Sequence, residues 1–413
     1  MLNKQQLLFI FYDKLNNSFV IFTILKSIMP NYPNSIKSKL PKVGTTIFST
    51  MSQLAHENQA INLSQGFPDF ETSQELIGLV NEAMKNGLNQ YAPMPGVMPL
   101  REQIAIKTAN LYGAEYNPES EVTITSGATQ AIYTAIAATI TEGDEVIIFT
   151  PAYDCYQPAI ELNGGRTVFV QMHAPDYRVN WDQVKKLITQ RTKMIIINTP
   201  HNPTGTVLEN EDMLALEKIV SDTDILLISD EVYEHIIFDG KQHQSVSKYP
   251  GLAERSFIVS SFGKTFHNTG WKMGYCLAPK NLMVEFRKAH QFIVFAVNTP
   301  VQYALAEYLK NENNYLNLSS FYQGKRDLFT SLIRDSRFET LPSSGTYFQL
   351  LSYKGISDKE DTDFAIELTE KYKIASIPVS VFYHQKVDEK ILRFCVAKKE
   401  ETLHQAAKII NSI

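Results

Sequence analysis

The sequence setting of one lysine, Lys264, favours covalent chemistry with a carbonyl compound. This residue follows an apolar, strand-like run over residues 257–261, and small and polar residues typical of a loop come after it. An amine held at the end of a strand, with hydroxyl groups around it, is placed to form a Schiff base with an aldehyde or ketone. The ordinary alternative is a surface lysine that marks the end of a strand. The rest of the chain favours the chemical interpretation, because it supplies further reactive groups in order.

Two earlier strand-like segments also lead into side chains that could take part in such chemistry. One leads into an Asn-Pro-x-Gly turn that begins at Asn202, and the other into Asp230, which Tyr233 follows three residues later. The order along the chain is therefore Asn-Pro-x-Gly, Asp-x-x-Tyr and Ser-x-x-Lys, the last from Ser261 to Lys264. Structural alternatives exist, since a strand-end carboxylate can cap the next helix and an asparagine can simply shape a turn.

With these motifs in this order, the chain resembles the class I/II aminotransferases, which are fold-type I enzymes that use pyridoxal 5'-phosphate (PLP). The resemblance covers roughly residue 39 to the C-terminus. It is strongest to the branch of methionine and kynurenine (glutamine/phenylpyruvate-type) aminotransferases. Residues 64–70, 154–156 and 298–300 are also similar to that branch. The fold implied is α/β, with a mixed, mostly parallel seven-stranded sheet in a large domain and a smaller α+β domain.

The resemblance implies a catalytic role for each residue of these motifs. Lys264 would hold PLP covalently and, once the amino-acid substrate displaces it, move the proton between Cα and C4′. Asp230 would face the pyridine nitrogen, where a carboxylate favours the protonated, electron-accepting ring. Tyr233 and Asn202 would hydrogen-bond the phenolate oxygen of PLP.

A phosphate site is predicted where Ser-Gly-Ala-Thr, residues 126–129, lies between a strand and a helix. Backbone N–H groups at the start of such a helix point toward an anion, although the same segment is also a good N-cap. The wider family usually has arginine where this chain has Lys272, but the branch commonly has lysine, which binds phosphate without the arginine fork. The predicted phosphate ligands are Gly127, Ala128, Thr129, Ser261 and Lys272.

Two tyrosines are assigned through the resemblance alone. Tyr153 lies where the family stacks an aromatic ring on the cofactor, although an aromatic residue after a strand is more often part of the core. Tyr91 corresponds to the tyrosine that reaches the phosphate of the neighbouring subunit's cofactor; without the resemblance it is an unremarkable loop residue. The resemblance thus implies a homodimer with active sites at the interface.

Arg393 lies inside an apolar strand-like segment, where arginine is unusual unless it is paired. Its planar guanidinium could hold a substrate α-carboxylate with two parallel hydrogen bonds, and a structural ion pair is the alternative. By resemblance, the backbone N–H of Gly66 would bind the same carboxylate, and Asn202 would also contact the substrate.

The side-chain pocket is less well defined by the sequence. Aromatic residues that could line it are Tyr91, Tyr153, Phe295 and Tyr347. Such walls favour large apolar side chains over aspartate, with broad specificity, because an apolar pocket separates near-isosteres by only about 1–3 kcal/mol. His201 is a candidate donor in the pocket or, equally, a residue behind it, and His267 has no stronger case.

Composition bounds the possible partners. With 44% apolar and 20% charged residues, the chain is typical of a soluble globular protein. Its net charge of −5 and the lack of a long basic run argue against a nucleic-acid partner. The three cysteines have no metal-ligand spacing, so we expect no metal and a reducing, cytoplasmic setting.

From residue 122 onward, apolar strand-like runs alternate with amphipathic helical runs, a pattern typical of a sheet with helices on both faces. Strands are expected at residues 122–125, 145–149, 167–171, 194–198, 225–229, 257–261 and 274–278, the last antiparallel by resemblance. Helices are expected over 130–140 and from 281 through the 290s. The expected divisions are 1–30 (extension or misassigned start), 31–65 (N-terminal arm and part of the small domain), 66–300 (large PLP-binding domain) and 301–413 (C-terminal small domain).

Apolar stretches at residues 7–12 and 19–25 are interrupted by charged and asparagine residues. They are too broken for a membrane helix of roughly 20 apolar residues and lack a small-x-small cleavage site, so neither a membrane anchor nor a secretory signal is expected. The alternatives are a misassigned start with the natural one at Met29, a lineage-specific extension, or an amphipathic interaction segment. We favour the first, because the family-like sequence begins only a little after Met29.

We therefore expect a PLP-dependent aminotransferase that moves the amino group of methionine, or of aromatic amino acids, to a 2-oxo acid by a ping-pong mechanism. The alternative enzyme is a cysteine-S-conjugate or cystathionine β-lyase, because the same residues could serve elimination of a β-leaving group. A transcriptional regulator would need an added helix-turn-helix, for which residues 1–40 are too short and insufficiently basic. A non-catalytic scaffold is disfavoured because the predicted catalytic residues are all present.

Overall fold

The computed structural model describes residues 6–13, 18–25, 32, 34–41, 43–385 and 387–413, and the chain divides into two compact units, Met1–Pro41 and Lys42–Ile413. In the first unit, β1 (Gln6–Asp13) pairs antiparallel with β2 (Ser18–Leu25). The apolar stretches of the N-terminal segment therefore lie in two paired strands, while the alternative start at Met29 lies outside the described residues. No helix in the described part of the chain is long and apolar enough to span a membrane.

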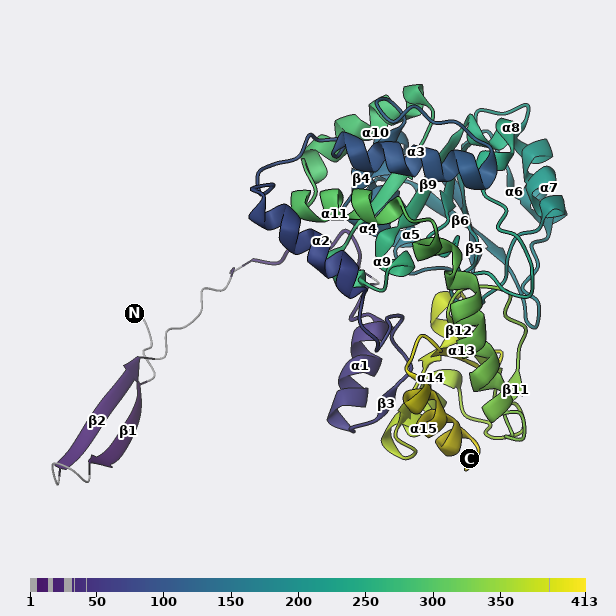
Figure 1. Ribbon diagram of the computed structural model, residues 1–413. Coiled ribbons are helices and arrows are strands. Elements are labelled where there is room, and N and C mark those ends of the chain that lie inside the picture. Colours follow the sequence, from purple (N-terminus) through teal and green to yellow (C-terminus); the bar gives the residue numbers. More distant parts are fainter. Residues whose placement is uncertain (1–5, 14–17, 26–31, 33, 42, 386) are drawn as a thin grey trace. The chain divides into compact units, whose positions relative to one another are not determined.

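The second unit is built on a seven-stranded sheet with the order β4-β10-β9-β8-β7-β5-β6 (Figure 1). Its strands are β4 (Val122–Thr125), β5 (Glu145–Thr150), β6 (Arg166–Gln171), β7 (Thr192–Asn198), β8 (Leu226–Asp230), β9 (Ser256–Ser261) and β10 (Gly274–Leu277). Strand β10 is antiparallel to β4 and β9, and the other neighbours pair in parallel. The predicted mixed, mostly parallel sheet is confirmed, with every expected strand end within two residues of the observed one.

Helices cover both faces of this sheet (Figure 1). They are α2 (Gln74–Lys85), α3 (Met98–Tyr112), α4 (Gly127–Thr139), α5 (Tyr156–Leu162), α6 (Trp181–Leu187), α7 (Asn210–Val220), α8 (Pro250–Ala253), α9 (Phe262–Thr265), α10 (Lys280–Ile293) and α11 (Thr299–Leu309). Successive side chains of a strand point to opposite faces, so in β7 Met194 and Ile196 pack with α4, α5 and α10. Ile195 and Ile197 belong to the core of the other face, with α3, α7 and α11. Burial of both faces explains the nearly continuous apolar strands.

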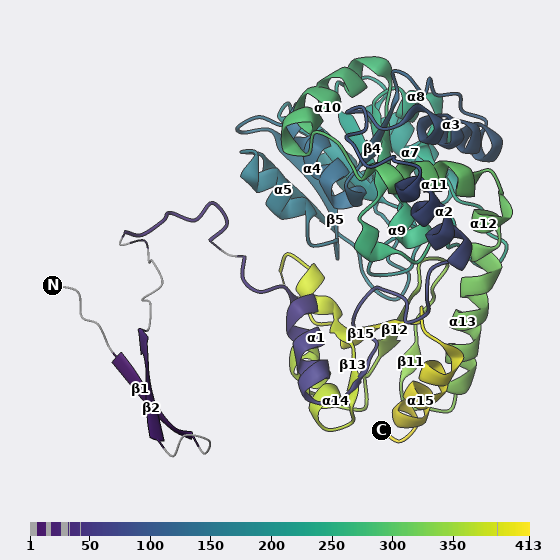
Figure 2. The same ribbon diagram turned by 60° about the vertical axis from the view of Figure 1, so that its left-hand side comes forward.

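A second, four-stranded sheet has the order β11-β12-β15-β14 and belongs to the smaller α+β part (Figure 2). Its strands are β11 (Glu339–Thr340), β12 (Phe348–Ser352), β14 (Ile377–Pro378) and β15 (Ile391–Cys395). The helices are α1 (Ile47–Glu57), α12 (Asn313–Leu316), α13 (Leu318–Leu332), α14 (Asp361–Glu370) and α15 (Glu400–Ile410). The N-terminal β3 (Ile61–Asn62) pairs in parallel with β13 (Ile374–Ala375), so residues from both ends of this unit build the smaller part.

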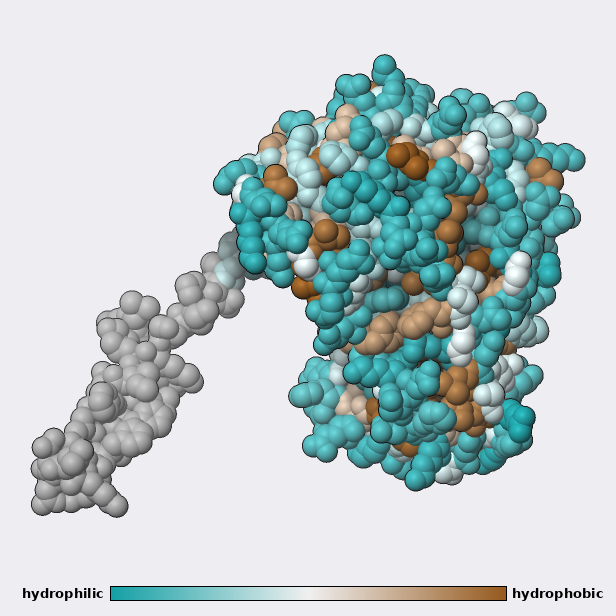
Figure 3. Space-filling model, in the orientation of Figure 1, coloured by the Kyte–Doolittle hydropathy of each residue, from teal (hydrophilic) through white to brown (hydrophobic). Residues whose placement is uncertain are grey.

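One helix begins earlier than expected, and one predicted domain division falls inside a helix. Helix α4 begins at Gly127, three residues before the expected start at residue 130. The expected start was late because the first turn of the helix is small and polar and carries no apolar periodicity. The predicted domain division between residues 300 and 301 falls inside α11 and stays a prediction. In the space-filling view hydrophilic residues cover most of the visible face, and apolar residues show at the waist between the two sheets (Figure 3).

Candidate active site

The carboxyl ends of β4, β5, β7, β8 and β9 meet at one edge of the large sheet, and most of the predicted site residues lie there. Ligands of open α/β sheets bind at this edge. One cavity at the edge has a volume of about 140 Å³ and is partly open to solvent. Every residue predicted to bind the cofactor, except Tyr91, lines this cavity: Gly127, Ala128, Thr129, Tyr153, Asn202, Asp230, Tyr233, Ser261, Lys264 and Lys272. Sequence reasoning missed the other lining residues, namely Ile132, Asn198, Val232, Gly263 and Thr269.

Asp230 ends β8 and is buried with one strong hydrogen-bond partner. The hydroxyl of Tyr156 donates to its Oδ2 at 2.6 Å, and the backbone N–H of Val232 lies 3.4 Å from Oδ1. Burial raises the pKa of Asp230 to about 6, and the hydrogen bond from Tyr156 opposes that rise. Tyr156 was not predicted as a site residue, although it ends the family-like segment 154–156. At pH 7 the carboxylate is therefore mostly ionised and can hold a positive charge in the cavity.

Asn198 joins the two loops that follow β7 and β8. Its amide nitrogen donates to the backbone oxygen of Asp230 at 2.8 Å, and its amide oxygen accepts from the backbone N–H of Asn202 at 2.8 Å. The bridge fixes the Asn-Pro-x-Gly turn against the end of the neighbouring strand.

Lys264 lies in α9, a single turn directly after β9. Its amine donates to the hydroxyl of Tyr347 at 3.0 Å and to the backbone oxygen of Gly66 at 3.3 Å. Burial lowers the pKa of Lys264 to about 8, so a substantial fraction of the amine is neutral near pH 7.5. A neutral amine is the form that can act as a nucleophile or accept a proton.

Another part of the cavity wall can take an anion. Helix α4 begins there without a side-chain cap, so the backbone N–H groups of its first turn have no helical partner. Gly127 has a left-handed φ of +75°, and a Cβ on it would lie 3.5 Å from the Nζ of Lys272, which therefore stands over the helix start. Free N–H groups and an ammonium at a helix N-terminus form an anion site.

Arg393 lies on β15 with only 1% of its surface exposed. It donates to the side-chain oxygen of Asn202 at 2.6 Å and to the backbone oxygen of Ser64 at 3.3 Å, while Nε has no partner. Its Cζ lies 3.8 Å from the ring centre of Phe348. Within the described ranges no acidic side chain forms an ion pair with it, so the structural alternative is not found there. A buried guanidinium without a counter-ion can bind a substrate carboxylate.

Three predicted or candidate residues lie elsewhere. Tyr91 is 83% exposed, outside the cavity, with its ring 5.3 Å from that of Phe295. His201 is buried, bonds Thr204 Oγ1 at 2.7 Å, and has a pKa lowered to about 3 by burial. His267 bonds the hydroxyl of Tyr322 at 2.8 Å. Neither histidine lines the cavity.

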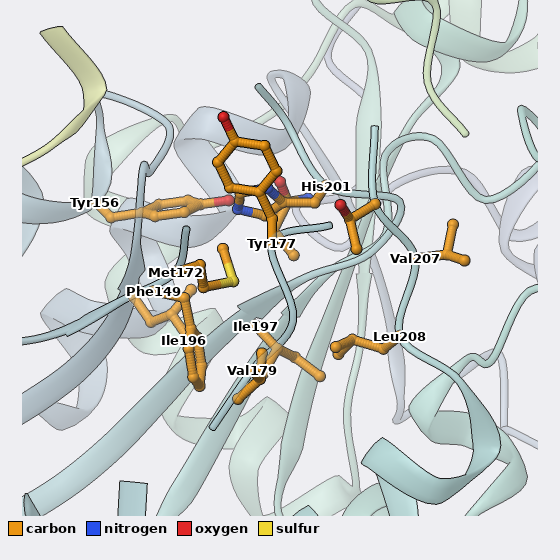
Figure 4. Close-up of a pocket in the computed structure, with 12 residues that line it drawn as sticks. Phe149, Tyr156, Met172, Tyr177, Val179, Ile196, Ile197, His201, Val207 and Leu208 are labelled. Atoms are coloured by element: carbon orange, nitrogen blue, oxygen red, sulfur yellow. The ribbon is translucent and has the colours of Figure 1, made fainter. Parts of the chain in front are cut away.

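His201 instead lines a second, apolar cavity of about 30 Å³ that shares Asn198 with the first. In Figure 4, Tyr156, Tyr177 and His201 lie at one end and aliphatic side chains at the other. This void lies behind the residues that hold Asp230.

A buried ion pair lies on the far side of the same sheet edge. The carboxylate of Glu234 accepts from Lys107 Nζ at 2.6 Å, Ser260 Oγ at 2.7 Å and the hydroxyls of Tyr112 and Tyr275 at 2.7 and 2.9 Å. Burial alone would raise the pKa of Glu234, but Lys107 holds it well below its usual range. Sequence reasoning missed this network, because its members lie far apart along the chain.

The fold and this arrangement define a fold-type I aminotransferase. The chain belongs to the family of class I and II aminotransferases, which matches residues 58–410. Over 386 residues it is 48% identical to methionine aminotransferase of Escherichia coli (strain K12), covering 93% of this chain and 100% of that protein. It is 33% identical to human kynurenine–oxoglutarate transaminase 1, covering 85% and 92%.

Solved structures that resemble this one are also structures of aminotransferases. A crystal structure of an Escherichia coli protein with methionine aminotransferase function superposes with a TM-score of 0.91 at 48% identity, covering 92% of this chain and 100% of that one. The structure of N-succinyldiaminopimelate aminotransferase from Mycobacterium tuberculosis gives 0.88 at 34% identity, covering 92% and 100%.

Proposed function

We propose that this aminotransferase uses PLP to move the amino group of methionine, or of an aromatic amino acid, to a 2-oxo acid by a ping-pong mechanism. The observation that carries the proposal is one cavity with three unlike groups. A buried amine of lowered pKa, Lys264, lies there with the buried carboxylate of Asp230 and with an uncapped helix start beside Lys272. This charge pattern fits the aldehyde, ring nitrogen and phosphate of PLP.

The residues present therefore fit the cofactor. Lys264 would hold it covalently, Asp230 would pair with its ring nitrogen, and the first turn of α4 with Lys272 and Ser261 would bind its phosphate. When bound, PLP supplies an electron sink for the charge that develops at the substrate Cα. Tyr153, Tyr233 and Asn202 line the same cavity and would contact the ring and its phenolate oxygen.

The remaining steps belong to the chain's own side chains. Arg393 and the backbone N–H of Gly66 would bind the substrate carboxylate and so fix the direction of the Cα–H bond. The neutral amine of Lys264 would accept the Cα proton and later return it. Asp230 would remain ionised above pH 6, the value to which burial raises its pKa, and would stabilise positive charge in the cavity.

Methionine is the preferred donor on two grounds. The Escherichia coli relative at 48% identity is a methionine aminotransferase, and the human relative at 33% is a kynurenine–oxoglutarate transaminase. Aromatic side chains at the site, such as Tyr153 and Tyr347, favour large apolar substrates. Neither relative is a lyase by name, so the β-lyase alternative gains no support.

The proposal includes a homodimer in which Tyr91 contacts the cofactor of the partner subunit. The exposure of Tyr91 outside its own chain's cavity supports this. Phe292, which is 87% exposed, and Phe295 present further apolar surface near the end of α10, where Phe295 contacts Tyr91. A cytoplasmic location remains an expectation from the cysteine content.

The test is the absorbance spectrum of the purified, PLP-supplied protein before and after addition of L-methionine without any 2-oxo acid. We expect the visible band of the bound cofactor to shift to that of its aminated form, with about one equivalent of the oxo acid of methionine released. A visible band that does not change on addition of methionine would support PLP as the cofactor but reject methionine as the donor. No band at all would reject the function.

A further inference from the structure

Two groups accept hydrogen bonds from the Lys264 amine, and the proposed function assigns neither of them an effect on that amine. Its Nζ donates to the hydroxyl of Tyr347 at 3.0 Å and to the carbonyl of Gly66 at 3.3 Å. The same hydroxyl donates to the same carbonyl at 2.6 Å. The three groups close a triangle at the edge of the cavity, which we call the lysine triangle.

The directions of these hydrogen bonds follow from the protons available. The single O–H of Tyr347 is donated to Gly66, so toward Lys264 the phenol oxygen can only accept. A neutral amine has two N–H groups and one lone pair, and the triangle uses both N–H groups. In the described part of the chain the hydrogen bonds of Nζ end on these two oxygens, so an ammonium would leave its third N–H unmatched in a buried place. The geometry therefore favours the neutral amine with its lone pair free.

Packing fixes the triangle in place. Tyr347 is fully buried, and its ring stands perpendicular to that of Tyr233 at 5.2 Å. A Cβ on Gly66 would fall 2.8 Å from Phe348 Cζ and 3.7 Å from Tyr347 Cε2, so only glycine allows this backbone to approach the two rings. The carbonyl of Gly66 and the hydroxyl of Tyr347 thus have little freedom to leave the amine.

We propose that Tyr347 is a positioning residue, whose hydroxyl acts with the Gly66 carbonyl to aim the lone pair of the free Lys264 amine at the substrate proton. The proposal rests on the proposed function and names what controls its proton-transfer step. In that step Nζ accepts the proton as the Cα–H bond breaks, the electron pair stays on the carbon skeleton, and Nζ later gives the proton back. Gly66 links the step to substrate binding, since its N–H is proposed to bind the carboxylate while its carbonyl holds the lysine.

The electrostatic setting is consistent with this role. Burial lowers the pKa of Lys264 to about 8, and burial raises the pKa of Tyr347 well above its usual range, so the phenol keeps the proton that it donates. The other charged or titratable groups that face the amine are Cys395, Arg393, Lys272, Asp230 and Tyr233. Removal of an acceptor from this place disfavours the ammonium and lowers the lysine pKa further.

The test compares Tyr347→Phe with the matched control Tyr322→Phe. Tyr322 is also fully buried, its ring lies 5.6 Å from that of Tyr347, and its hydroxyl bonds His267 instead of Lys264. The first readout uses cofactor-free protein: Lys264 is labelled with acetic anhydride across a pH series and quantified by peptide mass spectrometry. We expect an inflection near pH 8 in the unmodified protein and in the control, and about one pH unit lower in Tyr347→Phe.

The second readout is the single-turnover half-reaction with L-methionine and with α-deuterated L-methionine. In Tyr347→Phe the isotope-sensitive step should be about five- to tenfold slower, as for loss of one hydrogen bond, with donor affinity and PLP retention unchanged. Tyr322→Phe should match the unmodified protein. Equal inflections and equal rates in the two variants would overturn the proposal.

Two further outcomes are decisive. An inflection near the ordinary lysine value of about 10.4 in the unmodified protein would overturn the proposal without any variant, even if Tyr347→Phe does not fold, because a protonated amine has no lone pair to aim. If the unmodified protein labels as expected but takes up no PLP, the proposed function fails while the lysine triangle stands.

Discussion

The buried ion pair between Lys107 and Glu234 gives a stability prediction that follows from its contacts. Lys107→Met keeps an unbranched side chain but removes the charge. The Glu234 side chain, 3% exposed, would keep its three hydroxyl partners. Among the described residues, it would lose its only cationic partner at neutral pH, because burial lowers the pKa of the adjacent His235 to about 3.

Removal of one partner from a buried ion pair typically costs about 3–5 kcal/mol. The three hydroxyl donors that remain place the expected loss near the lower end, at about 3 kcal/mol. With an unfolding entropy of about 2.1 cal/mol/K per residue, a unit of this length should lose about 4 °C in Tm. In contrast, Lys288→Met, which breaks the exposed pair with Glu285 at 2.7 Å, should have no measurable effect.

The effect should depend on pH with a defined sign. In the unmodified protein Lys107 holds the pKa of Glu234 well below its usual range, so the stability from the pair is present above the ordinary carboxyl pKa and fades as the pH falls through the lowered one. Without Lys107, burial raises the pKa of Glu234 against the three hydroxyl donors that remain, so the variant takes up a proton there as the pH falls. The Tm deficit should therefore be larger at pH 8 than at pH 5.

The assay is thermal unfolding followed by circular dichroism at one scan rate, with Lys107→Met, Lys288→Met and the double variant Lys107→Met/Glu234→Gln side by side. The double variant should recover part of the loss, because no unpaired charge remains buried. Equal Tm losses for the buried and exposed lysines, or a deficit that grows as the pH falls, would refute the reasoning.

Four shorter predictions concern the site and the N-terminal unit. Lys264→Ala should lose both the visible absorbance of bound PLP and turnover, and normal transamination by this variant would reject the mechanism. Arg393→Ala should weaken donor binding by about 100-fold or more with PLP retained, measured by donor titration of the absorbance, since a charged hydrogen-bond pair is lost; loss of PLP with donor affinity intact would contradict this role. Tyr156→Phe removes a donor to Asp230, so the pKa of Asp230 should rise above about 6. As the pH is lowered, PLP affinity, measured by fluorescence, should therefore begin to fall at a higher pH than in the unmodified protein; an unchanged pH profile would count against this role of Tyr156. Deletion of residues 1–28 should leave the half-reaction intact, since the family match starts at residue 58, and an inactive or insoluble product would show a structural role.

Much of the candidate site could be predicted because its residues occur in short local sequence patterns. Asp230 is the last residue of β8, Lys264 lies three residues after β9, and Gly127 opens the helix after β4. Each is found by locating the end of an apolar run, and parallel pairing then places these ends at one edge of the sheet. The relatives define the same family, so the sequence order of the motifs was sufficient to identify the class of enzyme.

What could not be predicted depends on contacts between distant segments. Tyr156 reaches Asp230 across 74 positions of sequence, and Lys107 reaches Glu234 across 127. A tyrosine or a lysine in a helix has the same local sequence pattern whether or not such a partner exists. The start of α4 was placed late for a related reason, since backbone geometry and not apolar periodicity specifies its first turn.

Alternation along the strands explains why the ion pair bears on the cofactor site. Ser261 lines the cavity, so its neighbour Ser260 must point to the other face, where it donates to Glu234. Tyr233 and Glu234 divide in the same way after β8, the first toward the cavity and the second toward Lys107. A change that lets the Glu234 carboxylate move therefore shifts the backbone on which Tyr233 and Ser261 are mounted. The Lys107→Met variant should for this reason bind PLP more weakly as well as unfold earlier, although Lys107 does not line the cavity.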